Sequence, residues 1–212
     1  IGFCVCALLV GCGGQRSKEP SQPAADPLKS APTSELLEQG KQLAGQGDYI
    51  RAEQYLTAAL NRGHSSEEVV PLLLQVCIRG RRYQSALGHA RSALRTRPND
   101  WRLRYVIATL YEALGERGKA RKELERVITG DPGFGSAHYS LGALLWTAGD
   151  RRTAEVHMRR YLELEPEGQH ADDVRARLAT LAPRAKADAE ATPKKVPVRV
   201  QGELPQPKGD TP

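Results

Sequence analysis

The chain lacks the short motifs by which proteins bind phosphate or activate a nucleophile. It has no glycine-rich phosphate loop and no nucleophile motif, and its five histidines show no metal-ligand spacing. Isolated acidic residues in turns between helices are caps far more often than catalysts. We therefore expect no enzymatic activity, no cofactor, no metal and no small-molecule substrate.

A long apolar run is missing as well. The apolar stretch at residues 1–10 is too short to span a bilayer, which takes about 20 residues. It resembles the hydrophobic core of a secretion signal, but has no initiator Met and no basic segment before it, so we interpret residues 1–11 as a truncated lipoprotein signal peptide. Leu9-Val10-Gly11-Cys12 resembles the bacterial lipobox, which implies cleavage before Cys12 and lipidation of its thiol.

The residue after this cysteine bears on localisation. In enteric bacteria an Asp there retains lipoproteins in the inner membrane, whereas this chain has Gly13. The resemblance therefore implies a lipid-anchored, palmitate-type lipoprotein of the outer membrane that faces the periplasm. Several acyl chains together give stable anchoring. The alternatives are an ordinary signal peptide and a chance cysteine in an apolar run.

Cysteine is scarce beyond the signal. Cys4 and Cys6 lie in the segment to be removed and Cys12 carries lipid, so only Cys77 remains in the mature chain. An intramolecular disulfide is then excluded. Cys77 stands among leucines and valines of an apolar stripe, and we expect it to be a small buried side chain and not a nucleophile.

The charge is positive, with a net value of +6 and a pI of about 9.3. Such values are compatible with nucleic-acid binding. The arginines, however, are spread beside acidic residues, as on an ordinary solvated helix surface. We therefore expect no nucleic-acid partner.

A period of 34 residues organises most of the sequence. Ala52, Ala86, Ala120 and Ala154 are each 34 residues apart. In residues 135–168, apolar side chains recur at spacings of three and four on both sides of a Gly-Asp pair. This pattern predicts two amphipathic helices, with the Asp capping the second.

The period and its landmarks resemble the tetratricopeptide repeat (TPR), a helix–turn–helix unit of 34 residues. The alanine stands where the two helices of a repeat approach most closely, and Leu141-Gly142 match the family's pair in the first helix. Pro98, Pro132 and Pro166 follow the last three alanines by twelve residues, and His64 takes this place in the first repeat. The resemblance implies an all-α fold, a right-handed α-solenoid of four helix–turn–helix repeats plus a C-terminal capping helix.

The expected organisation follows from this register. We expect a signal peptide at 1–11, a lipidated cysteine and disordered linker at 12–32, a TPR domain at 33–182 and a disordered tail at 183–212. Within the TPR domain we expect repeats at 33–66, 67–100, 101–134 and 135–168, followed by a cap at 169–182. Stacked repeats bury a continuous core, and the cap covers the last apolar face.

The resemblance also implies a partner-binding groove on the concave face, lined by fixed positions of each first helix. These positions are Lys41, Gln75, Ile78, Arg79, Arg102, Tyr105, Thr109, Glu112, Tyr139, Ala143 and Trp146. The aromatic members would grip a peptide or helix of a protein partner. For Trp146, packing between repeats is the alternative. No asparagine occupies these positions, so the chaperone-tail clamp of some TPR proteins is not supported.

The expected function is that of a non-enzymatic adaptor or scaffold for protein–protein interaction, anchored to the membrane by lipid. The layout is similar to that of lipoprotein pilotins, which help secretins of type IV pili or secretion systems to assemble. Those pilotins commonly have six repeats, and four are visible here. A scaffold or regulatory subunit for an envelope, cell-wall enzyme is the other alternative.

Overall fold

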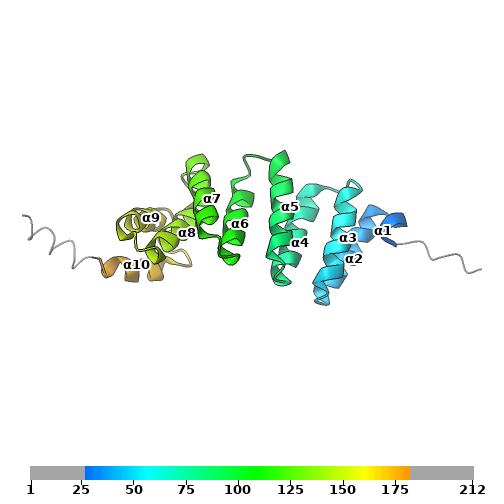
Figure 1. The fold of residues 1–212 in the computed structure, drawn as a ribbon, viewed down its shortest axis with the longest axis horizontal. Helices are drawn as coiled ribbons and strands as arrows, with labels where there is room; N and C mark the ends of the chain where they lie inside the picture. The colour runs from blue at the N-terminus through cyan, green and yellow to red at the C-terminus, as the bar shows by residue number, and fades with distance from the viewer. Residues whose placement is uncertain (1–26, 182–212) are drawn as a thin grey trace, which may run out of the picture. The chain divides into compact units, whose positions relative to one another are not determined.

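The computed structural model describes residues 27–181, and these residues are all-helical (Figure 1). They divide into two compact units, with the boundary inside one helix between Ala93 and Leu94. Each unit consists of consecutive antiparallel helices joined by short turns. The predicted all-α helix–turn–helix array is thereby confirmed.

Unit 1 begins with a single short turn of helix, α1 (Pro27–Ser30). Its main helices are α2 (Thr33–Gly45), α3 (Tyr49–Asn61), α4 (Ser66–Arg79) and α5 (Tyr83–Thr96), the last of which runs across the unit boundary. A core of leucines, valines and one alanine forms where α2, α3 and α4 meet, with Leu56 and Leu73 fully buried. Burying these side chains supplies the main stabilising free energy of the unit.

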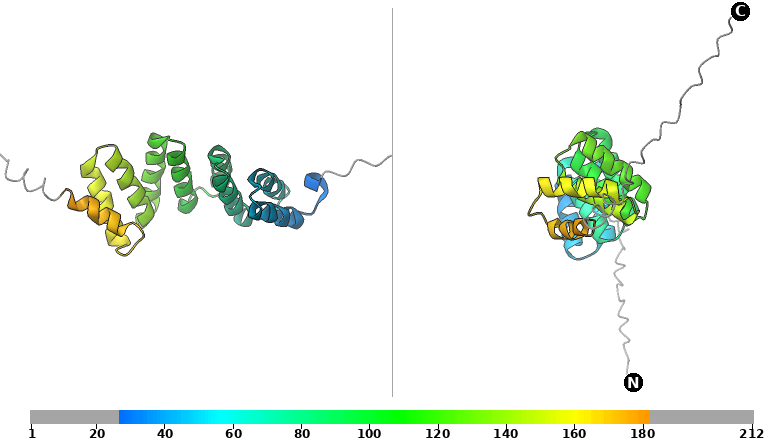
Figure 2. Two further views of the ribbon diagram at one scale, coloured as in Figure 1. Left: turned by 90° about the horizontal axis from the view of Figure 1, so that it is seen from below. Right: turned by 90° about the vertical axis from the view of Figure 1, so that its left-hand side faces the viewer.

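Unit 2 contains α6 (Trp101–Ala113), α7 (Arg117–Gly130), α8 (Gly135–Thr147), α9 (Arg151–Leu164) and α10 (Ala171–Ala179). Helix α6 packs on α7, α8 packs on α9, and α10 packs on α9 (Figure 2). Met158, Tyr161 and Val174 form a buried cluster between α9 and α10. The last helix thus covers an apolar face of the pair before it.

The turns within helix pairs follow the predicted chemistry. Gly47 and Gly149 adopt φ of +81° and +88°, and the carboxylates of Asp48 and Asp150 accept the backbone N–H groups of Arg51 and Thr153. A left-handed residue followed by an N-cap ends one helix and starts the next. Where α4 meets α5, Arg81 takes the left-handed position at φ +55°, which is strained for a side chain with a Cβ.

The helix crossings within pairs are close. Ala52, Ala86, Ala120 and Ala154 are all fully buried. An ideal Cβ placed on Gly40 of α2 would lie 2.7 Å from Leu56 Cγ of α3. Small residues are therefore required here because larger ones would push the two helices apart.

Residues 27–30, Ala148 and Pro71 show where the local structure differs from, or refines, what the sequence pattern predicts. Residues 27–30, assigned to the linker, form α1, which packs on α3, and the guanidinium of Arg62 donates to the carbonyl of Ala31. Ala148, which continues the spacing of the apolar stripe of α8, is the exposed C-cap of that helix. A proline near the start of a helix either fits there or delays the helix by a turn. Pro71 lies inside α4 with its side chain exposed, and the helix begins at Ser66, so the proline fits.

Part of the predicted organisation falls outside the described residues: the signal peptide, Cys12, most of the linker and the tail at 183–212. Between residues 27 and 181, none of the helices combines the length and the apolar composition that a membrane crossing requires. The repeat limits and the lipid anchor stay predictions.

Candidate functional site

In unit 1 the first helices of the two pairs, α2 and α4, together with α3, form a pocket of about 220 Å³. Three of the predicted groove residues, Lys41, Gln75 and Arg79, line it. They share it with small and apolar residues, which are Ala44, Gly45, Leu56, Leu72 and Val76. Gln75 and Arg79 are four residues apart on α4, which places both on one face of that helix. Lys41 of α2 lies on the other side of the pocket.

Of the two cationic side chains at this pocket, Lys41 is paired with carboxylates of the described residues and Arg79 is not. Lys41 Nζ lies 2.9 Å from Glu38 Oε1 and 3.4 Å from Glu68 Oε1. The hydrogen bond to Glu38, opposed by slight desolvation, raises the pKa of Lys41 above its usual value. Arg79 is exposed and makes no ion pair with any residue in the range 27–181. The pocket therefore offers one uncompensated cation beside an amide and an apolar floor.

Ile78, the fourth predicted groove residue of unit 1, does not line this pocket. Its side chain is 40% exposed on α4 and is one of the large apolar residues that the described surface leaves open. Ile78 is therefore an exposed apolar side chain on the same helix as Gln75 and Arg79, outside the pocket.

Four of the predicted groove residues in unit 2 lie on α6 and α8 and differ in exposure. Arg102 and Glu112 are exposed on α6. Thr109 is half-buried, and its hydroxyl donates to the carbonyl of Val106 at 2.9 Å. Ala143 is half-buried on α8. These side chains define a mixed polar surface, and in this part of the chain they carry no arrangement of catalytic groups.

The ring of Tyr105 is held between α6 and α8. Its hydroxyl lies 3.0 Å from Ser140 Oγ, and its ring centroid lies 5.1 Å from that of Phe134. The side chain is half-buried as a result. Tyr105 thus stabilises the packing of two helices and presents only part of its ring to solvent.

Tyr139 and Trp146 pack against the cluster of Met158, Tyr161 and Val174. The guanidinium of Arg151 covers the Trp146 ring at 3.8 Å from its centroid. Both aromatic residues are half-buried. The packing alternative for Trp146 is therefore the one that the contacts favour, and its side chain is only partly open to solvent.

The thiol of Cys77 behaves as the sequence predicts for a packed side chain. It is fully buried on α4. Burial, with a smaller contribution from the nearby carboxylate of Glu53, raises the pKa of Cys77 to about 12. The thiol is therefore protonated at neutral pH and is a poor nucleophile.

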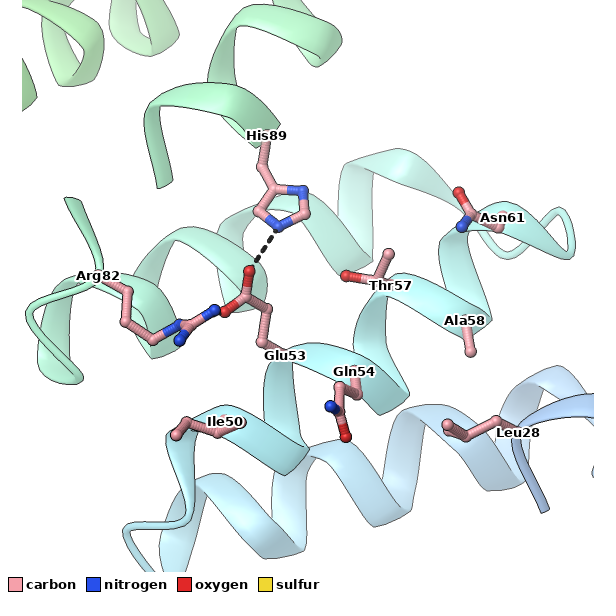
Figure 3. Close-up of a pocket in the computed structure, with 9 residues that line it drawn as sticks. All are labelled: Leu28, Ile50, Glu53, Gln54, Thr57, Ala58, Asn61, Arg82 and His89. Carbon is pink, nitrogen blue, oxygen red and sulfur yellow. Dashed lines mark hydrogen bonds and ion pairs between the residues drawn. The ribbon is translucent and has the colours of Figure 1, made fainter. Parts of the chain in front are cut away.

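A second pocket of about 490 Å³ lies on the other face of unit 1, over α1, α3 and α5 (Figure 3). Its titratable residues are Glu53, Arg82 and His89, none of which the sequence singled out as a site. Arg82 and His89 follow Glu53 by 29 and 36 residues in the chain. Their proximity could be predicted only from the packing of α3 against α5, the second helices of the two pairs.

Comparisons with known proteins bear on the fold. Residues 78–145 match the family model described as tetratricopeptide repeat. No curated protein sequence matches the chain closely enough to count as a relative.

Several solved structures are similar to it. YrrB, described as a TPR protein with an unusual peptide-binding site, is 19% identical, with 70% of this chain and 76% of that chain covered and a TM-score of 0.59. A TPR protein from Parabacteroides merdae is 24% identical, with 74% and 63% covered and a TM-score of 0.62. MamA from Desulfovibrio magneticus is 23% identical, with 65% and 78% covered and a TM-score of 0.55.

These likenesses agree with the helix pairs, their turns and the buried alanines described above. Interaction modules, and not enzymes, are typical of this fold. Residues 78–145 thus match the tetratricopeptide repeat, and the described residues have the tetratricopeptide-repeat fold.

Proposed function

We propose that the protein is a non-enzymatic adaptor that binds a peptide or helix of a protein partner on the first-helix face of its repeats. The pocket of Lys41, Gln75 and Arg79 carries this proposal, because it combines an apolar floor with polar groups at its rim. Ligand pockets in proteins commonly have this composition: apolar surface contributes affinity, and a few placed polar groups fix orientation.

The chemistry of the pocket defines the partner segment. Its volume of about 220 Å³ suits one or two side chains. The uncompensated guanidinium of Arg79 pairs well with a carboxylate, and Gln75 can both donate to and accept from a peptide backbone. We therefore propose a segment with an apolar side chain next to an acidic residue.

A binding role fits the fold, since solved proteins with it include one whose description names a peptide-binding site. That site is a property of YrrB. The absence of catalytic motifs in the sequence and the buried, protonated thiol of Cys77 support the non-enzymatic part of the proposal.

The membrane part of the proposal rests on sequence alone. Leu9-Val10-Gly11-Cys12 and Gly13 support a lipoprotein of the outer membrane that faces the periplasm. Replacing Cys12 by Ser should abolish incorporation of labelled fatty acid and move the protein out of the membrane fraction. Unchanged membrane partition, together with no labelling of the parent, would contradict the anchor.

Two finer roles remain as alternatives within this proposal. One is a pilotin-like assembly factor for a secretin, and the other is a scaffold or regulatory subunit for a cell-wall enzyme. A pull-down from solubilised membranes distinguishes them by the protein recovered: a secretin supports the first and a cell-wall hydrolase the second.

The same pull-down tests the pocket. Gln75→Trp should fill it from an exposed position and abolish capture, while Arg79→Ala should weaken capture in a manner that fades as salt rises. Arg152→Ala, an exposed arginine on the second helix α9, is the matched control and should bind like the parent. Equal capture by the parent and Gln75→Trp would show that this pocket is not the binding site.

A further inference from the structure

Three metal-ligating side chains converge inside unit 1. Glu53 of α3, Cys77 of α4 and His89 of α5 each offer one ligand atom, and these atoms all lie within 4.8 Å of one another. Glu53 Oε1 and His89 Nε2 lie 3.1 Å apart. Because each residue comes from a different helix, their spacing in the sequence does not predict the cluster.

The cluster is sheltered and partly oriented. Cys77 is fully buried, and the side chains of Glu53 and His89 are 12% and 21% exposed. The Nε of Arg82 donates to Glu53 Oε2 at 2.6 Å, which leaves Oε1 directed at His89 (Figure 3). A ligating carboxylate that is held by a second hydrogen bond in this way is typical of metal sites.

The donor set selects a class of metal. A thiolate, an imidazole and a carboxylate are the ligands that Zn²⁺ takes in proteins. At bond lengths of about 2.0–2.3 Å, neighbouring ligand atoms of a tetrahedral site are about 3.3–3.8 Å apart. The observed cluster needs only small side-chain adjustments to reach this spacing.

The fourth coordination position has access to solvent. Glu53 and His89 line the pocket of about 490 Å³ on the α3–α5 face, together with Arg82. A water molecule or an anionic group can therefore complete a tetrahedron built on three protein ligands. Arg82 would face such an anion and offset part of its charge.

We propose that Glu53, Cys77 and His89 bind one divalent zinc ion. The thiol of Cys77 releases its proton to solvent when it coordinates the ion. The ion joins α3, α4 and α5, and so ties the two helix pairs of unit 1 to each other. This site is separate from the pocket of Lys41, Gln75 and Arg79, and it does not depend on the proposed partner.

The test uses the full chain with Cys4→Ser, Cys6→Ser and Cys12→Ser, so that Cys77 is the only thiol. Metal is first removed with a chelator. Titration with Co²⁺ should then produce a thiolate-to-cobalt charge-transfer absorption that saturates at one ion per chain, and Zn²⁺ should displace it. No such band in the folded protein would overturn the proposal without any further variant.

Variants locate the site. Cys77→Ala should remove the band, and His89→Gln should weaken Zn²⁺ binding, measured by calorimetry, by about a hundredfold or more. Zn²⁺ should also raise the melting temperature of the parent but not of these variants. His157→Gln is the matched control, because His138 and His157 lie close enough together to offer a rival site, with Nδ1 atoms 3.1 Å apart. Zinc binding that is lost in His157→Gln and kept in His89→Gln would assign the ion to that pair and overturn the proposal.

Discussion

The imidazole of His170 lies flat on the ring of Tyr139, with ring centroids 3.9 Å apart and planes 2° apart. The Tyr139 hydroxyl also makes a long contact of 3.5 Å with Asp173 Oδ2 on α10. A side chain that the sequence assigned to partner binding is thus covered on one face by the segment that enters the last helix. Its first role is to hold α10 and the residues before it against α8.

We expect Tyr139→Ala to lower the free energy of unfolding by about 1–3 kcal/mol, because it removes the stack on His170 and the contact with Tyr161. Tyr139→Phe keeps both ring contacts and should change stability by less than about 0.5 kcal/mol. Urea unfolding of the two variants and the parent measures the difference. Equal midpoints for Tyr139→Ala and the parent would mean that the stack contributes nothing.

Trp146 offers a comparison between apolar packing and a cation–π contact. Trp146→Ala should cost about 2–4 kcal/mol of stability because the ring packs on Met158, Tyr161 and Val174. Arg151→Ala removes only the guanidinium that covers the ring and should cost less than about 1 kcal/mol. If Trp146→Ala instead melts like the parent and loses its partner, the residue is an exposed anchor after all.

Gly40 tests the close crossing of α2 and α3, and Gly88 of α5 serves as its control. Gly40→Ala should destabilise the protein by about 1–3 kcal/mol, since the new Cβ would lie 2.7 Å from Leu56 Cγ. Gly88→Ala, in α5, meets no heavy atom within 4 Å and should stabilise by about 0.5–1 kcal/mol through reduced backbone entropy of the unfolded chain. Thermal melting of both variants checks the opposite signs.

The buried alanines give a parallel test in unit 2. Ala120 is fully buried at the crossing of α6 and α7, and Ala120→Leu should overpack it at a cost of about 1–3 kcal/mol. Ala176→Leu, at an exposed position of α10, should leave stability unchanged. Equal melting temperatures for the two variants would contradict the close crossing that places Ala120 in the core.

The His138–His157 pair should make stability depend on pH. Burial is the main cause that lowers the pKa of each imidazole below 6.5 in the folded protein, with mutual repulsion adding to it for His157. The unfolded chain then binds more protons as the pH falls, so the stability present above pH 6.5 is lost as the pH falls through 6.5 toward the lowered folded pKa values. Unfolding curves at several pH values should show a smaller loss in His157→Gln than in the parent. Parallel curves for the two proteins would contradict this account.

Much of the fold could be predicted from sequence because its determinants are local. The 34-residue spacing of Ala52, Ala86, Ala120 and Ala154 placed four fully buried residues correctly. The Asp48 and Asp150 caps depend only on atoms three residues away in the chain. Helix periodicity, caps and left-handed turns are properties of short segments, and short segments are what a sequence displays.

The candidate site was predicted less completely, because it depends on contacts between helices. The resemblance selected Lys41, Gln75 and Arg79, which do share a pocket, but the contacts show that Tyr139 and Trp146 are engaged with α9 and α10. Side chains at equivalent repeat positions differ in exposure when their neighbours differ. The last repeat is followed by a terminal helix and not by a further repeat, so its side chains have different neighbours.

The sequence by itself determined that this chain forms pairs of amphipathic helices, and that Ala52, Ala86, Ala120 and Ala154 are buried between them. Only the tertiary structure decided that Glu53, Cys77 and His89, from three helices, meet within 4.8 Å, and that His170 stacks on Tyr139. The first set follows from hydrogen bonding and periodicity along a few consecutive residues. The second follows from the packing of whole helices, which brings side chains dozens of positions apart into contact and leaves no regular mark in the order of the residues.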